Sequence, residues 1–427
     1  MSTGTRRTVI TGCGLISPLG NDPDTFLTAL LAGKSGVRRI QAFDPSGLPV
    51  QFGGEVPDFD ARQFIDKKER KRLAIMPRPL QLGMAAAQLA MQSAGLQRGQ
   101  YDPTRFGVVF GGGTIPGEQI ALAPAARLST AGPGAIDLKK WGADGISLVP
   151  PMWMLNFVPN MLACHVSILH DAQGPLNTVT QTEAGGLLAL AEACRMIRHN
   201  RADIILVGAG DSRINAISGV RQNLYSPLSR RNDDPEEACR PFDLHRDGCV
   251  LGEAGGVLVV EEFEHARSRG VPIIGEITGH GSALDPDLVG DGLARCLKLA
   301  LDDAGIGPPE LDHVNAHGNG ARDGDAWEAH GIAKANGNEQ VPVFAVKGAI
   351  GNAGSAGGIV ELIASLAALR HGTIPATRNH RDPDPTCPVN VLTEPRQVSR
   401  DTVLKVSVTE LGQCAAVVCK LWKDRVD

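Results

Sequence analysis

The chain has 427 residues, of which 42% are hydrophobic and 21% charged. Its 42 Lys and Arg against 47 Asp and Glu give a formal net charge of −5, which argues against a nucleic-acid-binding surface, because phosphates need basic side chains to neutralise them. The apolar content is that of a globular protein and excludes a disordered chain. At about 150 residues per domain, the length suits one large domain or two to three ordinary ones.

Nine cysteines are scattered without a CxxC pair or regular spacing. This pattern disfavours a disulfide framework and a zinc site, so we expect reduced, mostly buried thiols and no bound metal. The first residues lead into a strand pattern without the apolar stretch of a signal peptide. The most apolar window, residues 149–164, is interrupted by Pro150, Pro151 and Pro159. We therefore expect a cytoplasmic protein without a membrane span.

Short β-branched runs alternate with Ala- and Leu-rich helical patterns, which predicts an α/β fold. In chain order the first part has predicted strands at 8–11, 107–110, 203–208 and 257–261, and predicted helices at 25–31, 80–94, 184–197 and 262–269. The second part has a strand at 272–278, a helix at 292–304, a strand near Val314, a Gly-rich stretch with a helix at 351–369, and strands at 403–408 and 415–420. The repeated order indicates two related halves, 1–262 and 263–427, although no strict short repeat is visible.

Three segments carry motifs that composition does not explain. They read Arg240-Pro-Phe-Asp243 followed by Gly252-Glu-Ala-Gly255, then Asn315-Ala-His-Gly318 with Gly324-Asp325, then Lys347 with Gly351 and Glu361. In this order and spacing they resemble the β-ketoacyl-acyl carrier protein synthases, the condensing enzymes of fatty acid and polyketide assembly. The opening segments Val9-Ile-Thr-Gly12 and Ser17-Pro-Leu-Gly20 are similar to that family as well.

The resemblance implies a thiolase fold, a five-layered α/β/α/β/α body built from two related halves and normally dimeric through a strand next to the active site. It implies an acyl carrier protein as partner, whose phosphopantetheine carries the substrate, and no bound cofactor. In a working member, a cysteine at the N-terminus of a buried helix takes the acyl chain as a thioester. Two histidines stabilise the oxyanion formed when the malonyl group loses carbon dioxide, a lysine organises the site, and a Gly-Phe-Gly-type loop gates it.

The sequence departs from this pattern at the nucleophile. Alignment on Gly174-Pro175 and Gly185 places Glu183 at the cysteine position. Cys194, the nearest cysteine downstream, lies about three helical turns further along the same predicted helix. That distance is too great for substitution, so we interpret Cys194 as a core thiol.

The other site positions are partly kept. His317 stands at the first histidine position and Lys347 at the lysine position, whereas Asn352 replaces the second histidine. An asparagine can donate a hydrogen bond to an oxyanion but cannot carry a positive charge. Asn319 and Ala321 replace two hydroxyl residues that would line the carrier-arm tunnel.

The gating loop is also altered. Glu410 falls at the position of the gating phenylalanine, and Gly412 is the one glycine of this loop that the sequence keeps. Together with Asn319 and Ala321, these two residues are the predicted substrate-binding positions.

A carboxylate at position 183 would be costly to bury alone, by several kcal/mol, so we expect an ion pair with Lys347 or with a protonated His317. In a structural interpretation, Glu183 fills the space of the cysteine and closes the site. In a functional interpretation, it is a general base or a carboxylate that repels or positions a malonyl group.

Three hypotheses follow. The departures resemble the chain length factors of type II polyketide synthases, which lack the nucleophilic cysteine and form a heterodimer with an active ketosynthase whose acyl cavity they shape. Typical members lose the first histidine, whereas this sequence keeps His317 and loses the second. The alternatives are a malonyl-carrier protein decarboxylase or other acyl-transfer enzyme that uses Glu183 and His317, and a non-catalytic homodimer that binds a carrier protein or a lipid.

Overall fold

The computed structural model describes residues 6–113 and 121–423. Its main feature is an eleven-stranded sheet with the order β14-β12-β11-β16-β17-β10-β1-β9-β8-β4-β7. The first half of the chain contributes β1 (Thr8–Ile16), β4 (Phe106–Gly111), β7 (Leu176–Val179), β8 (Ile204–Ser212) and β9 (Glu253–Glu262). The second half contributes β10 (Gly275–Leu284), β11 (His313–Asn315), β12 (Pro342–Phe344), β14 (Asn390–Val391), β16 (Thr402–Val408) and β17 (Gln413–Leu421). Three two-stranded ribbons pair β2 (Val37–Arg39) with β3 (Phe52–Gly54), β5 (Thr130–Gly132) with β6 (Ala135–Ile136), and β13 (Thr373–Ile374) with β15 (Arg396–Gln397).

The two halves of the large sheet repeat one pairing pattern. In the first half, β1, β9 and β8 are antiparallel neighbours, and β4 and β7 follow in parallel. In the second half, β10, β17 and β16 are antiparallel, and β11 and β12 follow in parallel. A short antiparallel contact between β1 and β10 joins the halves. The predicted plan of two related α/β halves is confirmed.

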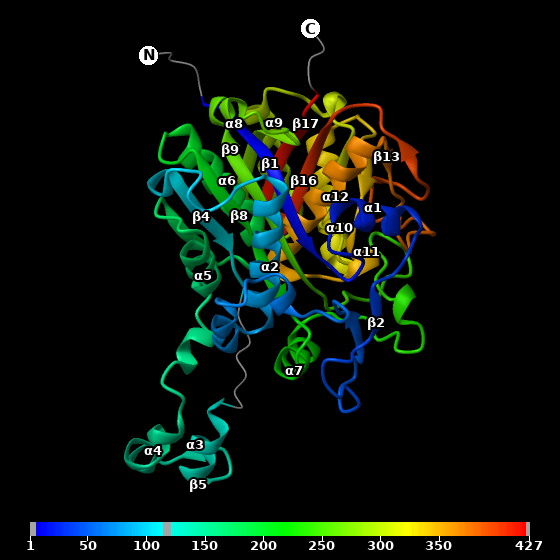
Figure 1. The fold of residues 1–427 in the computed structure, drawn as a ribbon. Coiled ribbons are helices and arrows are strands. Elements are labelled where there is room, and N and C mark those ends of the chain that lie inside the picture. Colours follow the sequence, from blue (N-terminus) through cyan, green and yellow to red (C-terminus); the bar gives the residue numbers. More distant parts are fainter. Residues whose placement is uncertain (1–5, 114–120, 424–427) are drawn as a thin grey trace.

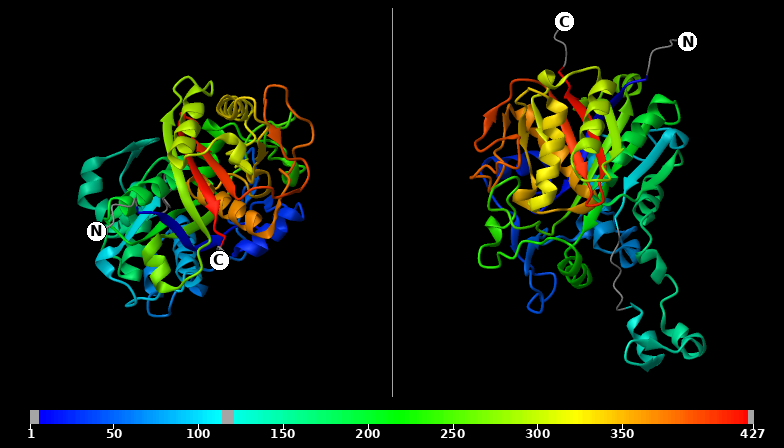
Figure 2. Two further views of the ribbon diagram at one scale, coloured as in Figure 1. Left: turned by 90° about the horizontal axis from the view of Figure 1, so that it is seen from above. Right: turned by 180° about the vertical axis from the view of Figure 1, so that it is seen from behind.

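The two halves of the large sheet form two of five layers, and helices form the other three (Figures 1 and 2). The central layer is α6 (Gly185–Arg198) and α12 (Gly357–His371), which share one core with strands of both halves. α2 (Arg78–Ser93) and α5 (Met161–His170) cover the outer face of the first half, and α9 (Asp291–Ala304) and α10 (Arg322–Asn336) cover that of the second. The remaining helices are α1 (Pro23–Leu31), α3 (Ala123–Leu128), α4 (Leu138–Ala143), α7 (Ala216–Tyr225), α8 (Phe263–Arg269) and α11 (Lys347–Ile350).

Glycines allow the outer helices to lie directly on the strands, and the two halves do this in the same way. A Cβ on Gly14 of β1 would lie 1.9 Å from the carbonyl oxygen of Ala86 on α2, and a Cβ on Gly281 of β10 would lie 2.2 Å from that of Cys296 on α9. Both strands also shift register two residues before these glycines, at 10–12 and 277–279. The same close approach thus occurs twice in the fold.

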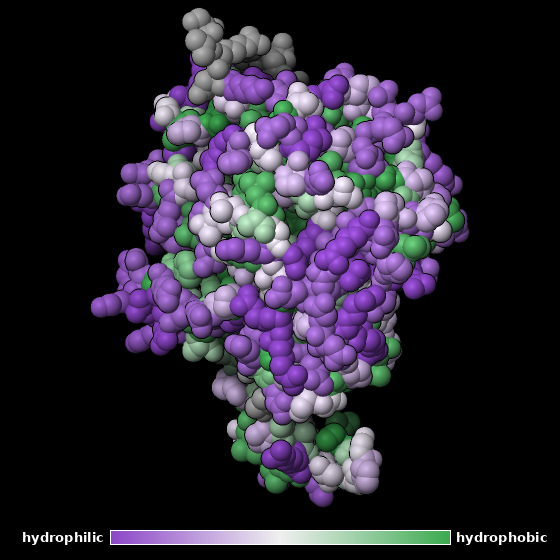
Figure 3. Space-filling view, turned by 90° about the vertical axis from the view of Figure 1, so that its right-hand side faces the viewer, coloured by the Kyte–Doolittle hydropathy of each residue, from purple (hydrophilic) through white to green (hydrophobic). Residues whose placement is uncertain are grey.

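An arm formed by residues 121–160 projects from the body (Figures 1 and 2). It contains α3, α4, the β5–β6 ribbon and short 3₁₀ turns. The space-filling view shows hydrophobic surface on this arm below the body (Figure 3). The exposed large apolar side chains that it carries are Leu128, Ile136, Leu138, Ile146, Leu148, Met152 and Met154.

The predicted strands and helices are all present, with ends shifted by a few residues. The largest shift is at β10, which begins at Gly275 and continues to Leu284 instead of ending at 278. The arm, α7 and α10 were not predicted, because Pro, Gly and polar residues interrupt their apolar periodicity. α5 was not predicted either, although it contains no Pro or Gly, because apolar residues fill most of its positions and mark no single face. Within the described ranges, no helix is long and apolar enough to cross a bilayer.

Candidate functional site

Residue 183 lies on a tight turn that connects the edge strand to a central helix. β7 ends at Val179, a 3₁₀ turn spans Thr182–Ala184, and α6 begins at Gly185. Thr182 adopts a φ of 38°, a left-handed conformation that costs about 1–3 kcal/mol in a non-glycine residue. The turn therefore presents Glu183 at the N-terminus of a fourteen-residue helix, where a negative charge is favoured.

Glu183 is buried and ion-paired. Arg213 Nη2 donates to Glu183 Oε1 at 2.5 Å, and Asn352 Nδ2 donates to the same oxygen at 3.3 Å. Burial alone would raise the pKa of Glu183, but the charge of Arg213, together with hydrogen bonds from Thr182, the backbone and Arg213, lowers it to about 2. The Glu183 carboxylate is therefore ionised at neutral pH.

Lys347 is not the partner of Glu183. Its Nζ donates to Glu361 Oε1 at 2.6 Å and to the carbonyl oxygen of His317 at 2.8 Å. Glu361 also pairs with Lys405 through its other oxygen. One buried carboxylate thus holds two buried lysines, and the expected ion pair between Lys347 and Glu183 is absent.

His317 is not a cation either. Burial, together with the charges of Lys347, Lys405 and Arg213, holds the pKa of its imidazole well below the usual range. Its backbone N–H donates to Glu328 Oε1 at 2.6 Å, and its buried Nδ1 has no hydrogen-bond partner. The expectation that Lys347 or a protonated His317 neutralises Glu183 is therefore wrong, and Arg213 has that role.

Arg213 and Asp211 are residues that the sequence analysis missed. They follow the apolar run of β8, and two opposite charges at the end of a buried strand are the signal that was available. Asp211 Oδ2 accepts the backbone N–H of Ser355 at 2.9 Å. Asn352 Oδ1 accepts the N–H of Gly354 at 3.1 Å. Contacts between β8 and the Gly-rich segment before α12 therefore hold the two halves together at this point.

A cavity of about 830 Å³ opens beside the turn. Among its lining residues are Glu183, Arg213, Arg221, Tyr225 and Glu410. Burial and the neighbouring charge of Glu183 raise the pKa of Glu410. The cavity wall thus carries both acidic and basic side chains.

Of the predicted site residues, only Glu183 and Glu410 line this cavity. His317, Lys347 and Asn352 lie behind the wall, each 4% exposed or less. Gly412 has a φ of 84°, and a Cβ there would lie 2.1 Å from the carbonyl oxygen of Asp285. This turn therefore requires glycine.

Asn319 and Ala321 form the turn that leads into α10. Asn319 Oδ1 accepts the N–H of Ala321 at 2.9 Å. Asp325 accepts the backbone N–H of Asn319 at 3.0 Å and that of Gly320 at 3.1 Å. Burial raises the pKa of Asp325 to about 6. Neither Asn319 nor Ala321 is among the residues that line the cavity.

All nine cysteines lie in the described part of the chain, and all are free. Burial raises the pKa of Cys194 to about 12. Cys249 lies within electrostatic range of Arg213, Glu410 and Glu183, but burial raises its pKa to about 12 as well. No cysteine is among the residues that line the cavity beside Glu183. In the same ranges, no group of three or more His, Cys, Asp and Glu residues is placed to hold a metal ion.

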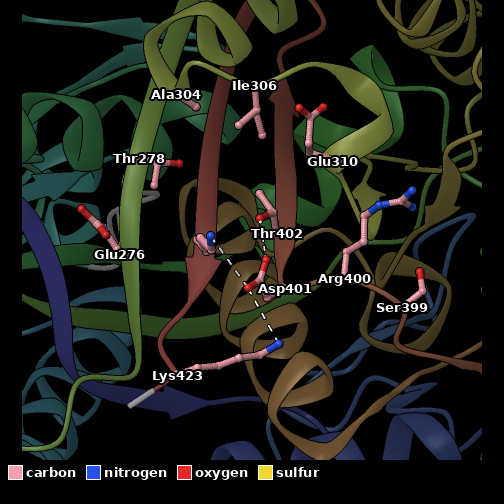
Figure 4. A pocket seen from close by; sticks show the side chains of 11 residues that line it. Glu276, Thr278, Ala304, Ile306, Glu310, Ser399, Arg400, Asp401, Thr402 and Lys423 are labelled. Carbon is pink, nitrogen blue, oxygen red and sulfur yellow. Dashed lines mark hydrogen bonds and ion pairs between the residues drawn. The ribbon is translucent and has the colours of Figure 1, made fainter. Parts of the chain in front are cut away.

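A second groove, of about 580 Å³, lies at the ends of β10 and β17 opposite to the ends that line the first cavity (Figure 4). Asp401 lies 3.9 Å from Lys420 and 3.8 Å from Lys423. Lys420 is near the end of β17, whereas Gln413 at its start lines the first cavity. At about 3.3 Å per residue, seven residues separate the two by roughly 23 Å. The groove is therefore separate from the turn at Glu183.

Comparison with known protein families identifies the chain. Residues 5–266 match the β-ketoacyl synthase N-terminal domain, and residues 274–381 match the β-ketoacyl synthase C-terminal domain. A 3-oxoacyl-[acyl-carrier-protein] synthase 2 of Coxiella burnetii is 36% identical over 411 residues, covering 94% of this chain and 95% of the relative. The tetracenomycin polyketide synthase ketoacyl synthase alpha subunit of Streptomyces glaucescens is 34% identical and covers 97% of each chain.

Solved structures agree with these matches. The ishigamide ketosynthase/chain length factor superposes with a TM-score of 0.85 at 30% identity, covering 98% of this chain and all of the other. A type II polyketide synthase acyl-carrier protein in complex with its ketosynthase gives a TM-score of 0.84 at 27% identity, again over 98% of this chain and all of the other. With its five-layered thiolase fold and full-length similarity to these proteins, the chain belongs to the β-ketoacyl synthase family.

Proposed function

We propose that this chain is a ketosynthase-like subunit of fatty acid or polyketide biosynthesis that lacks the nucleophilic cysteine. Glu183 takes its place, and the chain pairs with an active ketosynthase whose acyl cavity it shapes, as a chain length factor does. The observation that carries the proposal is the Glu183–Arg213 ion pair at the N-terminus of α6. It fills the position from which a thiolate would attack.

The chemistry of the held carboxylate supports this proposal. Condensation through a thioester needs an activated nucleophile, whereas Glu183 is an ionised carboxylate tied to Arg213 and Asn352. Because its pKa is about 2, it is a weak general base at neutral pH. Asn352 adds a hydrogen-bond donor but no charge. These properties disfavour both condensation and a decarboxylase that uses Glu183 as its base.

We also propose roles for the other residues of the site. Lys347 organises the buried charges around Glu361, and His317 provides a neutral imidazole behind the cavity wall. Glu410 and Gly412 form the loop at the edge of the cavity. Asn319 and Ala321 lie near the phosphopantetheine arm of a bound carrier protein. We propose 1–262 and 263–427 as the two halves that meet at this site.

The surface supports a partner of the same fold. β7 is one of the two edge strands of the large sheet, and Leu176 on it is 49% exposed. The arm carries further exposed apolar side chains. A sheet edge and a group of exposed apolar side chains are features that a partner chain covers. Two of the structural neighbours are named as a ketosynthase/chain length factor and as an acyl-carrier protein bound to its ketosynthase.

The test is to purify the chain alone and together with a complete Cys-His-His ketosynthase encoded beside it, and to supply each with malonyl-carrier protein. We expect the lone chain to release no carbon dioxide above background and to gain no acyl mass in mass spectrometry. We expect the ketosynthase to make full-length product only when this chain is present. Catalytically inactive partner, with its cysteine replaced by alanine, is the control for product formation.

Two results with the lone chain would contradict the proposal. One is carbon dioxide release by the lone chain that is abolished in Glu183→Ala or His317→Ala, which would establish the decarboxylase. The other is acylation of the lone chain that disappears in Cys249→Ala, which would establish a displaced thiol nucleophile. A self-associating chain that binds carrier protein but has no effect on any ketosynthase would instead support the non-catalytic homodimer.

A further inference from the structure

Arg213 is a cation held in the wall of an open cavity between two carboxylates. Its side chain is 14% exposed and lines the cavity of about 830 Å³. Glu183 accepts its hydrogen bond at 2.5 Å, and the charges of Glu183 and Asp211 both raise the pKa of its guanidinium. A buried guanidinium without an anion would cost several kcal/mol. The site at Arg213 therefore requires a negatively charged partner.

The donors around the Glu183 carboxylate suit a planar anion. The guanidinium is a rigid fork of N–H groups that matches carboxylate geometry. Asn352 Nδ2 donates to the same carboxylate, and its own orientation is fixed because Oδ1 accepts the N–H of Gly354. The N-terminus of α6 adds a favourable dipole. Three independent elements thus converge on one carboxylate.

We propose that Arg213 in the cavity wall and Asn352 behind it form a carboxylate-binding subsite, and that the side chain of Glu183 is its built-in ligand. In the natural chain the subsite is filled, so the free carboxylate of a small acid or of a malonyl group finds no open cation at this turn. Removing the Glu183 side chain opens the subsite to a small external carboxylate. This inference goes beyond the proposed function, because it concerns binding and holds whether or not the chain pairs with a ketosynthase.

Asp211 and Glu410, the other carboxylates nearby, interact with Arg213 through their charge, but neither forms an ion pair with it in the described structure. Asp211 Oδ2 is held by the N–H of Ser355 at 2.9 Å and is packed so closely that a Cβ on Gly354 would lie 2.1 Å from it. Glu410 lies on a turn at the cavity edge, and no ion pair with Arg213 is formed in the described structure. An external anion is therefore the expected substitute once the Glu183 carboxylate is gone.

The experiment compares the natural chain with Glu183→Ala and Glu183→Ser, using sodium formate and sodium acetate as probes against sodium chloride at matched ionic strength. We expect formate and acetate to raise the melting temperature of both variants in a concentration-dependent way, because a ligand that binds only the folded state stabilises it. Binding of ¹³C-formate, followed by NMR line broadening, should be at least tenfold tighter in the variants than in the natural chain.

The matched control is the double variant Glu183→Ala with Arg213→Gln, which has the same space but no cation. It should lose the response to formate and acetate. A response of the double variant equal to that of the single variants would overturn the proposal. The absence of a response in both single variants would overturn it as well, because it would mean that Arg213 has turned to Asp211. If Glu183→Ala is recovered folded only in formate buffer, removal of formate by dialysis should unfold it. No activity is measured, so failure here is distinct from failure of the proposed function.

Discussion

At the scale of single residues, the site is governed by which cation reaches which carboxylate. The buried region contains three cations, Lys347, Lys405 and Arg213, and the first two share Glu361. Arg213 is therefore the cation that remains for Glu183. His317 stays neutral because it is buried beside three positive charges. Glu183 is thus held by a residue outside the motifs that identify the family.

The first prediction concerns Arg213→Gln. The substitution leaves Glu183 buried without its cation, so we expect a loss of about 3–5 kcal/mol in the free energy of unfolding at pH 7.5. The double variant Glu183→Gln with Arg213→Gln should recover more than about 1 kcal/mol of this loss, because a neutral amide replaces the unpaired charge. Urea unfolding followed by circular dichroism measures both values. A double variant no more stable than Arg213→Gln would contradict the assigned ion pair.

The pH dependence of the same variant has a definite sign. The pKa of Glu183 is lowered from its ordinary value of 4.5 to about 2 in the folded chain. Its contribution to stability is therefore complete above about pH 4.5 and is lost as the pH falls towards about 2. In Arg213→Gln, burial raises the pKa of Glu183 instead, so protonation relieves the variant. We expect the stability difference from the natural chain to be smaller at pH 4 than at pH 7.5.

At the scale of helices and strands, the two halves use the same contact to place their outer helices. Gly14 on β1 faces Ala86 on α2, and Gly281 on β10 faces Cys296 on α9. Each glycine follows a register shift in its strand. A side chain at either position would push a helix off the sheet. The absence of a side chain at these two glycines thus sets the distance between each outer helix and the strand beneath it.

The second prediction compares Gly14→Ala with Gly47→Ala. The added Cβ at Gly14 would lie 1.9 Å from the Ala86 carbonyl oxygen, whereas nothing lies within 4 Å of a Cβ at Gly47. We expect Gly14→Ala to lose about 3 kcal/mol or more through overpacking, or to be recovered only as insoluble protein. Gly47→Ala should change stability by less than about 0.5 kcal/mol. Thermal unfolding checks both, and equal melting temperatures would refute the close approach.

At the scale of the whole molecule, the arm projects away from the body of the described chain (Figure 1). Residues 121–160 extend away from the body and expose seven large apolar side chains (Figure 3). Exposed apolar area of this kind marks an interaction surface. β7 is one edge of the large sheet, and the proposed partner would cover both this edge and the arm.

The third prediction tests this surface with Leu138→Asp combined with Ile146→Asp. These side chains are 79% and 58% exposed, so the variant should keep its melting temperature within about 2 °C, as surface substitutions do. Charges placed in a buried interface are costly, so we expect association with the partner ketosynthase to weaken at least tenfold, measured by light scattering across a dilution series. Leu299→Asp on α9, at a site 46% exposed, is the control and should leave association unchanged. Equal association of both variants would exclude the arm from the interface.

Local sequence determined a large part of this protein. Periodicity located the strands and helices of both halves, and the resemblance to the ketosynthase family predicted that Glu183, Asn352 and His317 lie in one buried region. Periodicity did not predict the secondary structure of the arm or of α7, since Pro, Gly and polar residues break their apolar pattern.

Tertiary structure decided which charged side chains of the site form ion pairs and which side chain is neutral. The sequence predicted an ion pair of Glu183 with Lys347 or with a protonated His317. Lys347 instead pairs with Glu361, and burial keeps His317 neutral. Arg213 reaches Glu183 from the end of β8, thirty residues further along the chain. Spacing along a chain cannot show which of several buried cations reaches a carboxylate, because pairing and pKa depend on distance and desolvation in three dimensions. The packing of β8 against α6 therefore determines the state of the site.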